Sequence, residues 1–421
     1  MAYMRLGDLL IASGVITQEQ LDKALAVQKE THQRLGDVLM QNGFITERNL
    51  IDALQIQLGV EFVDLTAVSI PVELARYVPR NIARKFCVVP VKLVQDTLYL
   101  AMSDPLDFVA QEQVKAASRK KVIPMIATRQ ATEEELTQKA AKALDEMMRF
   151  GTTTCEAKSG YGLALEHELK QLRAIRRLQE EHPMDVTATF MGAHLVPAEY
   201  KQDRAEYIRL VCEEMMPAVK EQGIAKFCDV FCEADTFTVE ESRQILEAGL
   251  RHGLRPKIHA DEIEAIGGSQ LAGEIGAISA EHLIVCPPEG IASMAKGGVI
   301  ACLLPATSFC LGSTYAPARE MVSAGVPVAM ASDFNPGSCP CLNLQLVINL
   351  GCLRYRLTPE EVLTAVTLNA AAAIDMADHV GSVEAGKQGD LVIWDAPDLD
   401  YICYRFGSNL VQTVIKKGRL V

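Results

Sequence analysis

The stretch KFCDVFCEADTFTVEESRQILEAGLRHGLRPKIHADEI, from Lys226 to Ile263, contains two short apolar segments, Phe227–Cys232 and Pro256–His259. Segments of this kind are typical of strands that are buried in a parallel sheet. The residues between them are numerous enough for the crossover helix that joins two parallel strands. The stretch therefore predicts a β-α-β unit.

The same alternation continues through the chain from about Ala131 to its end. Helical stretches such as His167–Glu180 and Ala205–Glu221 separate the predicted strands. The strands are Thr152–Lys158, Asp185–Ala193, Phe227–Cys232, Pro256–His259, Ala280–Val285, Val299–Leu304 and Val326–Ala331. Seven strands in series predict an α/β fold, a TIM-like barrel that lacks one unit.

Polar side chains of reactive types follow the ends of these strands. In a barrel the carboxyl ends of the strands meet at one face, where active sites are built. One histidine at such a place is more often a core residue than a ligand, but three histidines together with Asp333 favour a metal site. Imidazole and carboxylate are ligands of hydrolytic zinc or iron ions. The residues are Tyr161, His194, Glu233, His259, Asp261, Glu262, His282, Asp333, Asn335, Gly337 and Ser338.

Several segments of this region carry a resemblance: FGTTTCEAKSGYGL, TFMGAHLVP, KIHADEI, SDFNPGS and GKQGDLVIWDAP. Through them the chain from about residue 131 to Val421 resembles the imidazolonepropionases of the amidohydrolase superfamily. The resemblance implies remnant C-terminal β-strands beside the barrel, a cytoplasmic hydrolase of histidine degradation and, since such enzymes commonly pair, a homodimer. The reaction it implies opens the cyclic amide of 4-imidazolone-5-propanoate to N-formimidoyl-L-glutamate.

The resemblance also implies roles for single residues. It makes His259 and Asp333 ligands of one Zn²⁺ or Fe³⁺ ion, and Glu262, His282 and Asp333 catalytic. Glu262 and Asp333 would move protons, while His282 and His194 would hold the ring carbonyl. The substrate contacts that it implies are Tyr161, His194, Glu262, Asn335, Gly337 and Ser338.

One part of the family pattern has no counterpart here. The family needs a histidine-x-histidine pair, which supplies two further metal ligands, at the end of its first barrel strand, and an arginine nearby. This chain has no such pair, and His32 is its only histidine before His167. We therefore expect weakened metal binding and impaired activity. Either Val88–Val94 or Thr97–Met102 is a candidate to fill the place of the missing strand.

The amino-terminal region contains an internal repeat. RLGDLLIASGVITQEQLDKALAVQ (Arg5 to Gln28) recurs as RLGDVLMQNGFITERNLIDALQIQ (Arg34 to Gln57), with 12 of 24 positions identical. Each copy predicts a short helix that ends at a glycine and a second helix capped by a threonine, Thr17 or Thr46. The sequence thus predicts two helical hairpins, in an α+β domain that extends beyond them.

Two interpretations of the repeats remain open. The hairpins could simply pack on one another, or their paired arginines could bind a ligand with two equivalent halves. Together with GVEFVDL, YVPRNIARKFCVVPV and LYLAMSDPLD, the repeats resemble the amino-terminal domain of type II secretion and type IV pilus assembly ATPases, some of which bind cyclic di-GMP. No G-x-x-x-x-G-K-[ST] loop of the ATPase itself occurs. The contacts implied are Arg5, Gly7, Gly14, Gln28, Arg34, Gly36, Gly43 and Gln57.

The composition of the whole chain sets the remaining expectations. The 421 residues carry a formal charge of −13, which argues against nucleic-acid polymers and anionic membranes as partners and favours small molecules. No secretory signal is visible, so we expect a cytoplasmic protein with twelve reduced cysteines. We expect divisions at residues 1–60, 61–128 and 129–421. The alternative function is a cyclic di-GMP-binding module fused to an inactive barrel.

Overall fold

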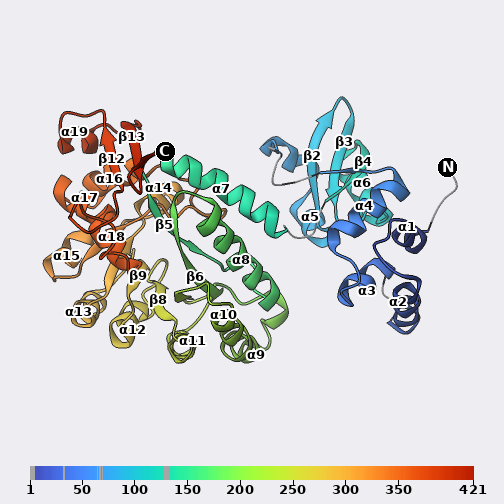
Figure 1. Cartoon of the computed structure of the whole chain (residues 1–421), viewed down its shortest axis with the longest axis horizontal. Helices are drawn as coiled ribbons and strands as arrows, with labels where there is room; N and C mark the ends of the chain where they lie inside the picture. The colour runs from blue at the N-terminus through green and yellow to red at the C-terminus, as the bar shows by residue number, and fades with distance from the viewer. Residues whose placement is uncertain (1–4, 32–33, 64, 66–67, 69, 128–131) are drawn as a thin grey trace. The chain divides into compact units, whose positions relative to one another are not determined.

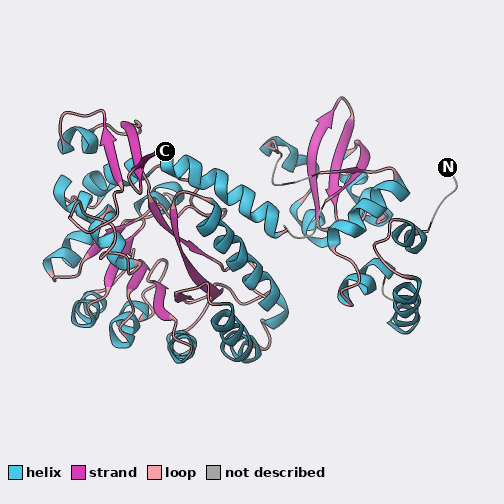
Figure 2. Cartoon of the chain, viewed as in Figure 1, coloured by secondary structure: helices cyan, strands magenta, loops and turns pink. Residues whose placement is uncertain are grey.

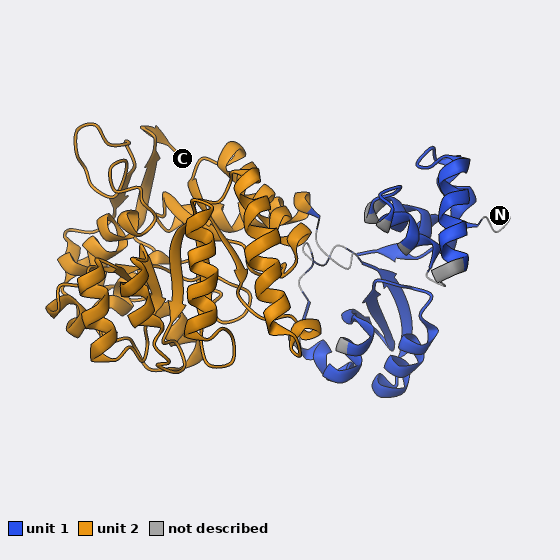
Figure 3. Ribbon diagram, turned by 90° about the horizontal axis from the view of Figure 1, so that it is seen from below, with its two compact units in different colours: residues 1–132 blue, residues 133–421 orange. Residues whose placement is uncertain are grey.

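The computed structural model describes residues 5–31, 34–63, 65, 68, 70–127 and 132–421. These residues form two compact units, Met1–Thr132 and Glu133–Val421 (Figure 3). His32 and the expected boundary at 128/129 lie outside the described residues. No described helix is long and apolar enough to cross a membrane.

Each amino-terminal repeat forms the two helices that its sequence predicts. The threonine hydroxyls accept hydrogen bonds from the backbone N of Gln20 and Asn49, as expected of helix caps. Gly14 and Gly43 follow the C-cap residue of the first helix in each copy and have φ of 71° and 67°, a conformation that suits glycine. The four helices are α1 (Leu6–Ala12), α2 (Gln18–Thr31), α3 (Leu35–Gln41) and α4 (Glu47–Leu58).

The two repeats pack on one another around a shared core. Helix α1 contacts α4, and α2 contacts α3. Gly7 and Gly36 are buried at equivalent places, where an added Cβ would lie 2.7 Å from Leu21 Cδ1 and 2.9 Å from Leu50 Cδ1 respectively. Close helix packing thus accounts for both glycines without a ligand.

The rest of the first unit is a four-stranded sheet in the order β1-β4-β3-β2. Strands β2 and β3 pair antiparallel, whereas β4 is parallel to β1 and β3. The expectation that Val88–Val94 or Thr97–Met102 fills the barrel is wrong, because both segments belong to this sheet. Its elements are β1 (Glu61–Phe62), η1 (Val72–Tyr77), α5 (Arg80–Phe86), β2 (Val88–Val94), β3 (Thr97–Met102), α6 (Phe108–Ser118) and β4 (Lys121–Ile126).

The second unit contains a seven-stranded, all-parallel sheet whose strands follow chain order from β5 to β11. All seven predicted strands are present, and the fold class, a TIM-like barrel that lacks a strand, is confirmed. Among the described residues, β5 and β11 each pair on one side only. The strands are β5 (Thr154–Lys158), β6 (Asp185–Ala193), β7 (Phe227–Cys232), β8 (Arg255–Ala260), β9 (Ser279–His282), β10 (Ile300–Leu303) and β11 (Val328–Met330).

Helices surround the outside of this sheet (Figures 1 and 2). The predicted helix 205–221 is interrupted in its middle by a π-helical segment. The helical elements are α7 (Glu133–Arg149), α8 (Leu165–Glu181), η2 (Ala198–Tyr200), α9 (Arg204–Arg209), the π-helical η3 (Leu210–Met215), α10 (Met216–Gln222), α11 (Val239–Arg251), α12 (Gly268–Ile275), α13 (Pro288–Gly297), α14 (Pro305–Leu311), α15 (Ala318–Ser323), α16 (Leu344–Arg354), α17 (Pro359–Val366), α18 (Leu368–Ala373) and α19 (Leu399–Tyr404).

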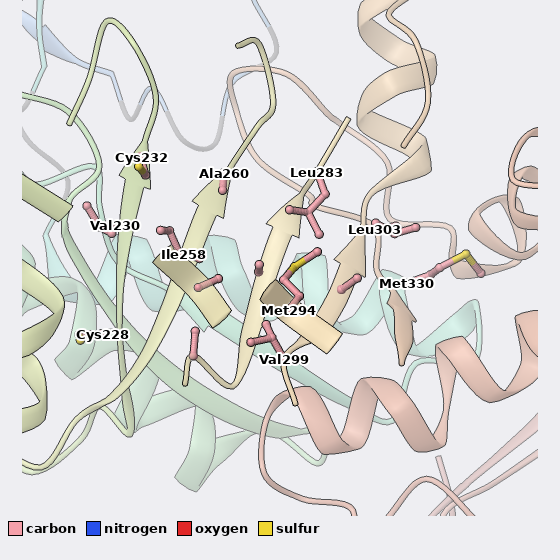
Figure 4. Packing of buried hydrophobic residues seen from close by; sticks show 14 of the residues in the cluster. Cys228, Val230, Cys232, Ile258, Ala260, Leu283, Met294, Val299, Leu303 and Met330 are labelled. Carbon is pink, nitrogen blue, oxygen red and sulfur yellow. The ribbon is translucent and has the colours of Figure 1, made fainter. Parts of the chain in front are cut away.

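The strands place alternate residues on opposite sides of the sheet. Cys228, Val230 and Cys232 of β7 pack in the hydrophobic core with Ile258 and Ala260 of β8 (Figure 4). The residues that alternate with them along each strand, such as Asp229 of β7 and Lys257 of β8, therefore point into the barrel interior. This alternation places charged groups there although the strands look apolar.

A small antiparallel sheet at the carboxyl terminus is tied to the barrel by a buried lysine. The sheet consists of β12 (Leu391–Trp394), β13 (Val411–Lys416) and β14 (Arg419–Leu420). Lys416 Nζ, whose side chain is 1% exposed, lies 2.6 Å from Asp185 Oδ2 and 2.5 Å from Asp390 Oδ2. A single ammonium thus joins the start of β6 to this sheet.

We expect Lys416→Ala to lower the free energy of unfolding by about 3 kcal/mol, because it leaves two carboxylates without their buried cation. Fluorescence of Trp394, the only tryptophan, reports the transition in urea. Lys417→Ala is the control, since Lys417 pairs with the same Asp185 but is 53% exposed, and should cost less than about 1 kcal/mol. Equal losses in both variants would contradict the bridging role.

Candidate functional site

Five aromatic rings lie in series across the carboxyl ends of five neighbouring strands. Tyr161 follows β5 and its ring centroid is 5.2 Å from that of His194, which directly follows β6. Phe231 of β7 lies 6.0 Å from His194 and 6.1 Å from His259 of β8, which is 5.2 Å from His282 of β9. The structure therefore brings the three predicted histidines and Tyr161 together.

Glu262 lies beside this series on the loop after β8. Its Oε1 atom is 3.6 Å from His282 Nδ1, and its side chain is 14% exposed. Burial raises the pKa of Glu262, the nearby His259 lowers it, and the negative charges of Asp333 and Glu233 raise it. The net result is a pKa of about 6. Burial and the nearby His259 hold the pKa of His282 well below its usual range. Glu262 can therefore exchange a proton near neutral pH beside a neutral imidazole.

Asp333 and the three residues predicted after it form one hydrogen-bonded loop beyond β11. Asp333 Oδ2 accepts a hydrogen bond of 2.5 Å from the hydroxyl of Thr307 on α14, and burial raises the pKa of Asp333. Asn335 donates to the Asp333 carbonyl, and its own Oδ1 accepts from the backbone N of Gly337 and Ser338 at 2.8 and 2.7 Å. Asn335 thus shapes the loop.

Strained backbone gathers at the same end of the barrel. Leu163, Asp261, His282, Leu283 and Asp333 all have φ between 51° and 70°, the left-handed region that costs energy for residues with a Cβ. All five lie in or just after β5, β8, β9 or β11. Such strain persists only where surrounding contacts hold it, and it is common at functional sites.

The barrel interior also contains a cluster of ion pairs, which was not predicted from the sequence. Lys158 Nζ lies 2.7 Å from Asp229 Oδ2 and 2.9 Å from Glu156 Oε1. Lys257 Nζ, whose side chain is 1% exposed, lies 3.0 Å from Glu156 Oε2 and 3.3 Å from Glu281 Oε1. We call these five residues the interior ion cluster. Polar residues at every second position of apolar strands were the signal for it.

His259 is oriented by this cluster. Its Nδ1 lies 3.0 Å from Asp229 Oδ1. Since a carboxylate only accepts, Nδ1 carries the proton of that bond and leaves Nε2 for a ligand. Burial opposes protonation of His259, but Asp229 outweighs it and raises the pKa of the imidazole.

The metal ion that the resemblance implies would need at least three side-chain ligands close together. Within the described part of the chain, the group of three donors close enough for one ion is Asp229, His259 and Glu281. Its carboxylates are already ion-paired with the two lysines of the cluster, and an ion there would face both ammonium groups. The implied ligands His259 and Asp333 are only two, whereas zinc sites usually have at least three protein ligands. The structure thus contains a candidate metal site, as expected for the metal-dependent amidohydrolase type, but it offers fewer unpaired ligands than a resident zinc or iron ion usually has.

The predicted contacts of the first unit are distributed over its repeats. Arg5 is exposed before α1, Gln28 lies in α2 and Gln57 in α4. Arg34, equivalent to Arg5, forms an ion pair with Asp104. It also borders a pocket of about 300 Å³ that is further lined by Lys85, Phe86, Cys87, Met102, Ser103, Asp104 and Asp107. A ligand that binds Arg34 must therefore compete with Asp104.

Two sequence profiles match the chain. The amidohydrolase family matches residues 124–421. The MshEN domain matches residues 58–143, which begins where the second repeat ends and so leaves out the arginines of both repeats.

Individual proteins support the first match. The chain is 56% identical over 296 residues to imidazolonepropionase of Alkaliphilus metalliredigens and 54% identical over 295 residues to that of Geobacillus kaustophilus, covering 70% of each chain in both cases. Its fold resembles that of a zinc-bound adenosine deaminase from Xanthomonas campestris, with a TM-score of 0.54 and 17% identity over 72% of this chain and 84% of that chain. The chain therefore belongs to the amidohydrolase family and, within it, to the imidazolonepropionases, hydrolases that act on a carbon–nitrogen bond of a cyclic amide.

Proposed function

We propose that the second unit hydrolyses 4-imidazolone-5-propanoate to N-formimidoyl-L-glutamate. We propose a rate far below that of an imidazolonepropionase that has the histidine-x-histidine pair. The observation that carries the proposal is the position of Glu262, whose carboxylate lies beside His282 within the series of rings at the carboxyl ends of the strands. The high identity to imidazolonepropionases supports the substrate.

The residues of the site would have different roles in this reaction. Glu262, with its raised pKa, takes a proton from the attacking water and returns it to the leaving nitrogen. His194 Nδ1 lies 3.0 Å from the carbonyl oxygen of Gly160 and therefore donates to it. The neutral ring then offers Nε2 as an acceptor, which suits an N–H group of the substrate ring better than its carbonyl. Tyr161, Asn335, Gly337 and Ser338 border the same face and are proposed substrate contacts.

The slow rate follows from the poor fit to a metal ion. A bound zinc or iron ion supplies an activated water in this family, and activation of water by a metal is worth several kcal/mol. Two of the ligands that the family pattern provides are absent from this sequence. We therefore propose that the ion is bound only weakly.

Hydrolysis should become detectable when the full chain is incubated with substrate and a large excess of Zn²⁺ or Fe³⁺. Glu262→Gln should remove it, because the amide cannot accept a proton, whereas Glu264→Gln in the same loop is the control and should leave it unchanged. Chromatography of N-formimidoyl-L-glutamate measures the product. Absence of product at saturating metal would contradict the hydrolase function, and turnover near 10 s⁻¹, the common enzyme value, without added metal would contradict the impairment.

We propose a second function for the first unit, the binding of cyclic di-GMP. The match to the MshEN domain supports it. The equivalent positions of Arg5 and Arg34 in the two repeats also support it. Two guanidinium groups can pair with the two phosphates or stack on the two bases of such a ligand.

Calorimetry with cyclic di-GMP tests this function. The parent chain should release heat with a fitted affinity, and Arg5→Ala combined with Arg34→Ala should weaken it at least about a hundred-fold, since two charge-assisted contacts of 1.5–3 kcal/mol each are lost. The exposed Arg80 of α5 provides the control substitution, Arg80→Ala. No heat from the parent chain would remove this function.

A further inference from the structure

The loop after β8 carries Glu262, and a carboxylate from the neighbouring strand holds its backbone. Glu233 directly follows β7 and is 2% exposed. Its Oε2 accepts a hydrogen bond of 2.9 Å from the backbone N of Ile263, and its Oε1 accepts one of 3.0 Å from the backbone N of Glu264. One side chain therefore binds the two residues that directly follow Glu262.

Glu233 is itself held firmly. Its backbone N donates to the carbonyl of Phe237 at 3.1 Å, and its carbonyl accepts from the backbone N of Thr236 at 3.0 Å. The Thr236 hydroxyl donates to the carbonyl of Phe231 in β7 at 2.6 Å. The carboxylate thus projects from a turn that is fixed to the barrel.

The other side of Glu262 is held by β9 and the residues after it. The carbonyl of Asp261 accepts a hydrogen bond of 2.9 Å from the backbone N of Val285, and the carbonyl of Ala260 accepts one of 3.1 Å from Leu283. Asp261 has φ of 51°, so the chain turns sharply just before Glu262. Without the bonds from Glu233, only one side of this turn would be fixed.

Burial of the Glu233 carboxylate needs a reason, because an unpaired buried charge is costly. None of the ion pairs found among the described residues includes Glu233. In the part of the chain that the structure describes, its oxygens accept hydrogen bonds from backbone N–H groups only, those of Ile263, Glu264 and, at 3.1 Å, Ala234. These hydrogen bonds therefore determine the geometry of the loop after β8.

We propose that Glu233 is a positioning residue for Glu262, holding the loop after β8 so that the Glu262 carboxylate stays beside His282. The inference rests on the acid–base role proposed above for Glu262, but the hydrogen bonds that define it exist whether or not the chain turns over substrate. Amide exchange and histidine resonances can therefore test the role of Glu233 without turnover.

A matched control exists on the other side of the site. Glu168 of α8 is 0% exposed, and its carboxylate accepts hydrogen bonds from the backbone N of Gly160, Gly162 and Leu163 at 3.0, 2.8 and 2.8 Å. It holds the loop after β5 in the same chemical manner. Glu168→Gln should loosen that loop and leave the loop after β8 unchanged.

Amide hydrogen exchange on the full chain separates the two loops. In Glu233→Gln, the new amide group cannot accept both hydrogen bonds. Exchange in peptides that cover residues 262–266 should become at least about ten-fold faster, since a net hydrogen bond is worth roughly 1 kcal/mol or somewhat more. Peptides that cover residues 159–164 should be unchanged. Glu168→Gln should give the reverse pattern.

The ring-nitrogen resonances of His282, observed with ¹⁵N-labelled histidine, report whether Glu262 has moved. Glu233→Gln should shift them in the direction that Glu262→Gln does, whereas Glu168→Gln should not. Glu233→Asp, which keeps the charge but is one methylene shorter, should give a smaller shift of the same sign and serves if the glutamine variant unfolds. Unchanged exchange and unchanged His282 resonances in both Glu233 variants, or equal changes in both loops, would overturn the proposal. Failure of hydrolysis in the parent would affect only the proposed function.

Discussion

Replacing Lys257 with methionine should lower the free energy of unfolding of the second unit by about 3–5 kcal/mol. The lysine side chain is 1% exposed and lies between Glu156 and Glu281, which are themselves 14% and 3% exposed. Methionine fills the volume of the lysine stem but leaves both carboxylates short of a cation in a place that water scarcely reaches. Urea unfolding followed through Trp394 measures the loss.

The size of this effect depends on the unpaired charge, so removing a carboxylate together with the lysine should restore part of the stability. In Lys257→Met combined with Glu281→Gln, we expect a recovery of at least about 1 kcal/mol relative to the single variant. A double variant that is as unstable as the sum of the two single variants would contradict the interpretation of the interior ion cluster as a set of coupled pairs.

Supplying the missing strand should increase turnover by at least about three orders of magnitude. A chimera would replace residues 1–132 with the segment of an imidazolonepropionase that contains the histidine-x-histidine pair of the family pattern and the strand before it. The added strand would pair with the sides of β5 and β11 that are unpaired within the described part of the chain, and it would add the two absent histidine ligands. Several kcal/mol of stabilisation from a metal-activated water correspond to this factor, at 1.36 kcal/mol per factor of ten.

The design of the chimera includes its own control. The same chimera with both histidines of the added pair changed to glutamine keeps the strand but not the ligands, and should stay near the slow rate of the parent. Equal turnover of the two chimeras would show that closure of the barrel matters and the ligands do not, which would contradict our account of the impairment.

The strands of the second unit could be predicted because short apolar segments recur between helical stretches, which is the pattern of β-α units in a parallel sheet. Cys228, Val230 and Cys232 of FCDVFC pack in the core on the helix side of the sheet, whereas Asp229 and Lys257 face the interior. Phe231, which shares the face of Asp229, lies between the rings of His194 and His259. The predicted site residues lie together for a related reason: parallel strands place their carboxyl ends at one face of the sheet. The repeat predicted its helices because each copy contains its own cap and its own stop.

The features that sequence reasoning missed depend on contacts between distant segments. The pairing of Lys158 with Asp229, or of Thr307 with Asp333, needs the curvature of the sheet, which no local pattern contains. The bonds of Glu233 to the next loop depend on backbone atoms, whose hydrogen-bonding groups are the same in every residue except proline. The π-helical segment within the predicted helix 205–221 is an exception, because it has a local signal: Pro217, two residues beyond its end, has no backbone N–H to donate to the Glu213 carbonyl.

The metal content of the purified full chain tests the account most directly. The interior ion cluster leaves its carboxylates paired with lysines, and only His259 and Asp333 remain of the implied ligands. Mass spectrometry of the metals, after expression with zinc and iron present and removal of loosely bound ions, should therefore find less than about 0.1 ion per chain, since two protein ligands are fewer than such sites usually need. One zinc or iron ion per chain, lost in His259→Ala, would contradict the proposal that the metal ion is bound only weakly.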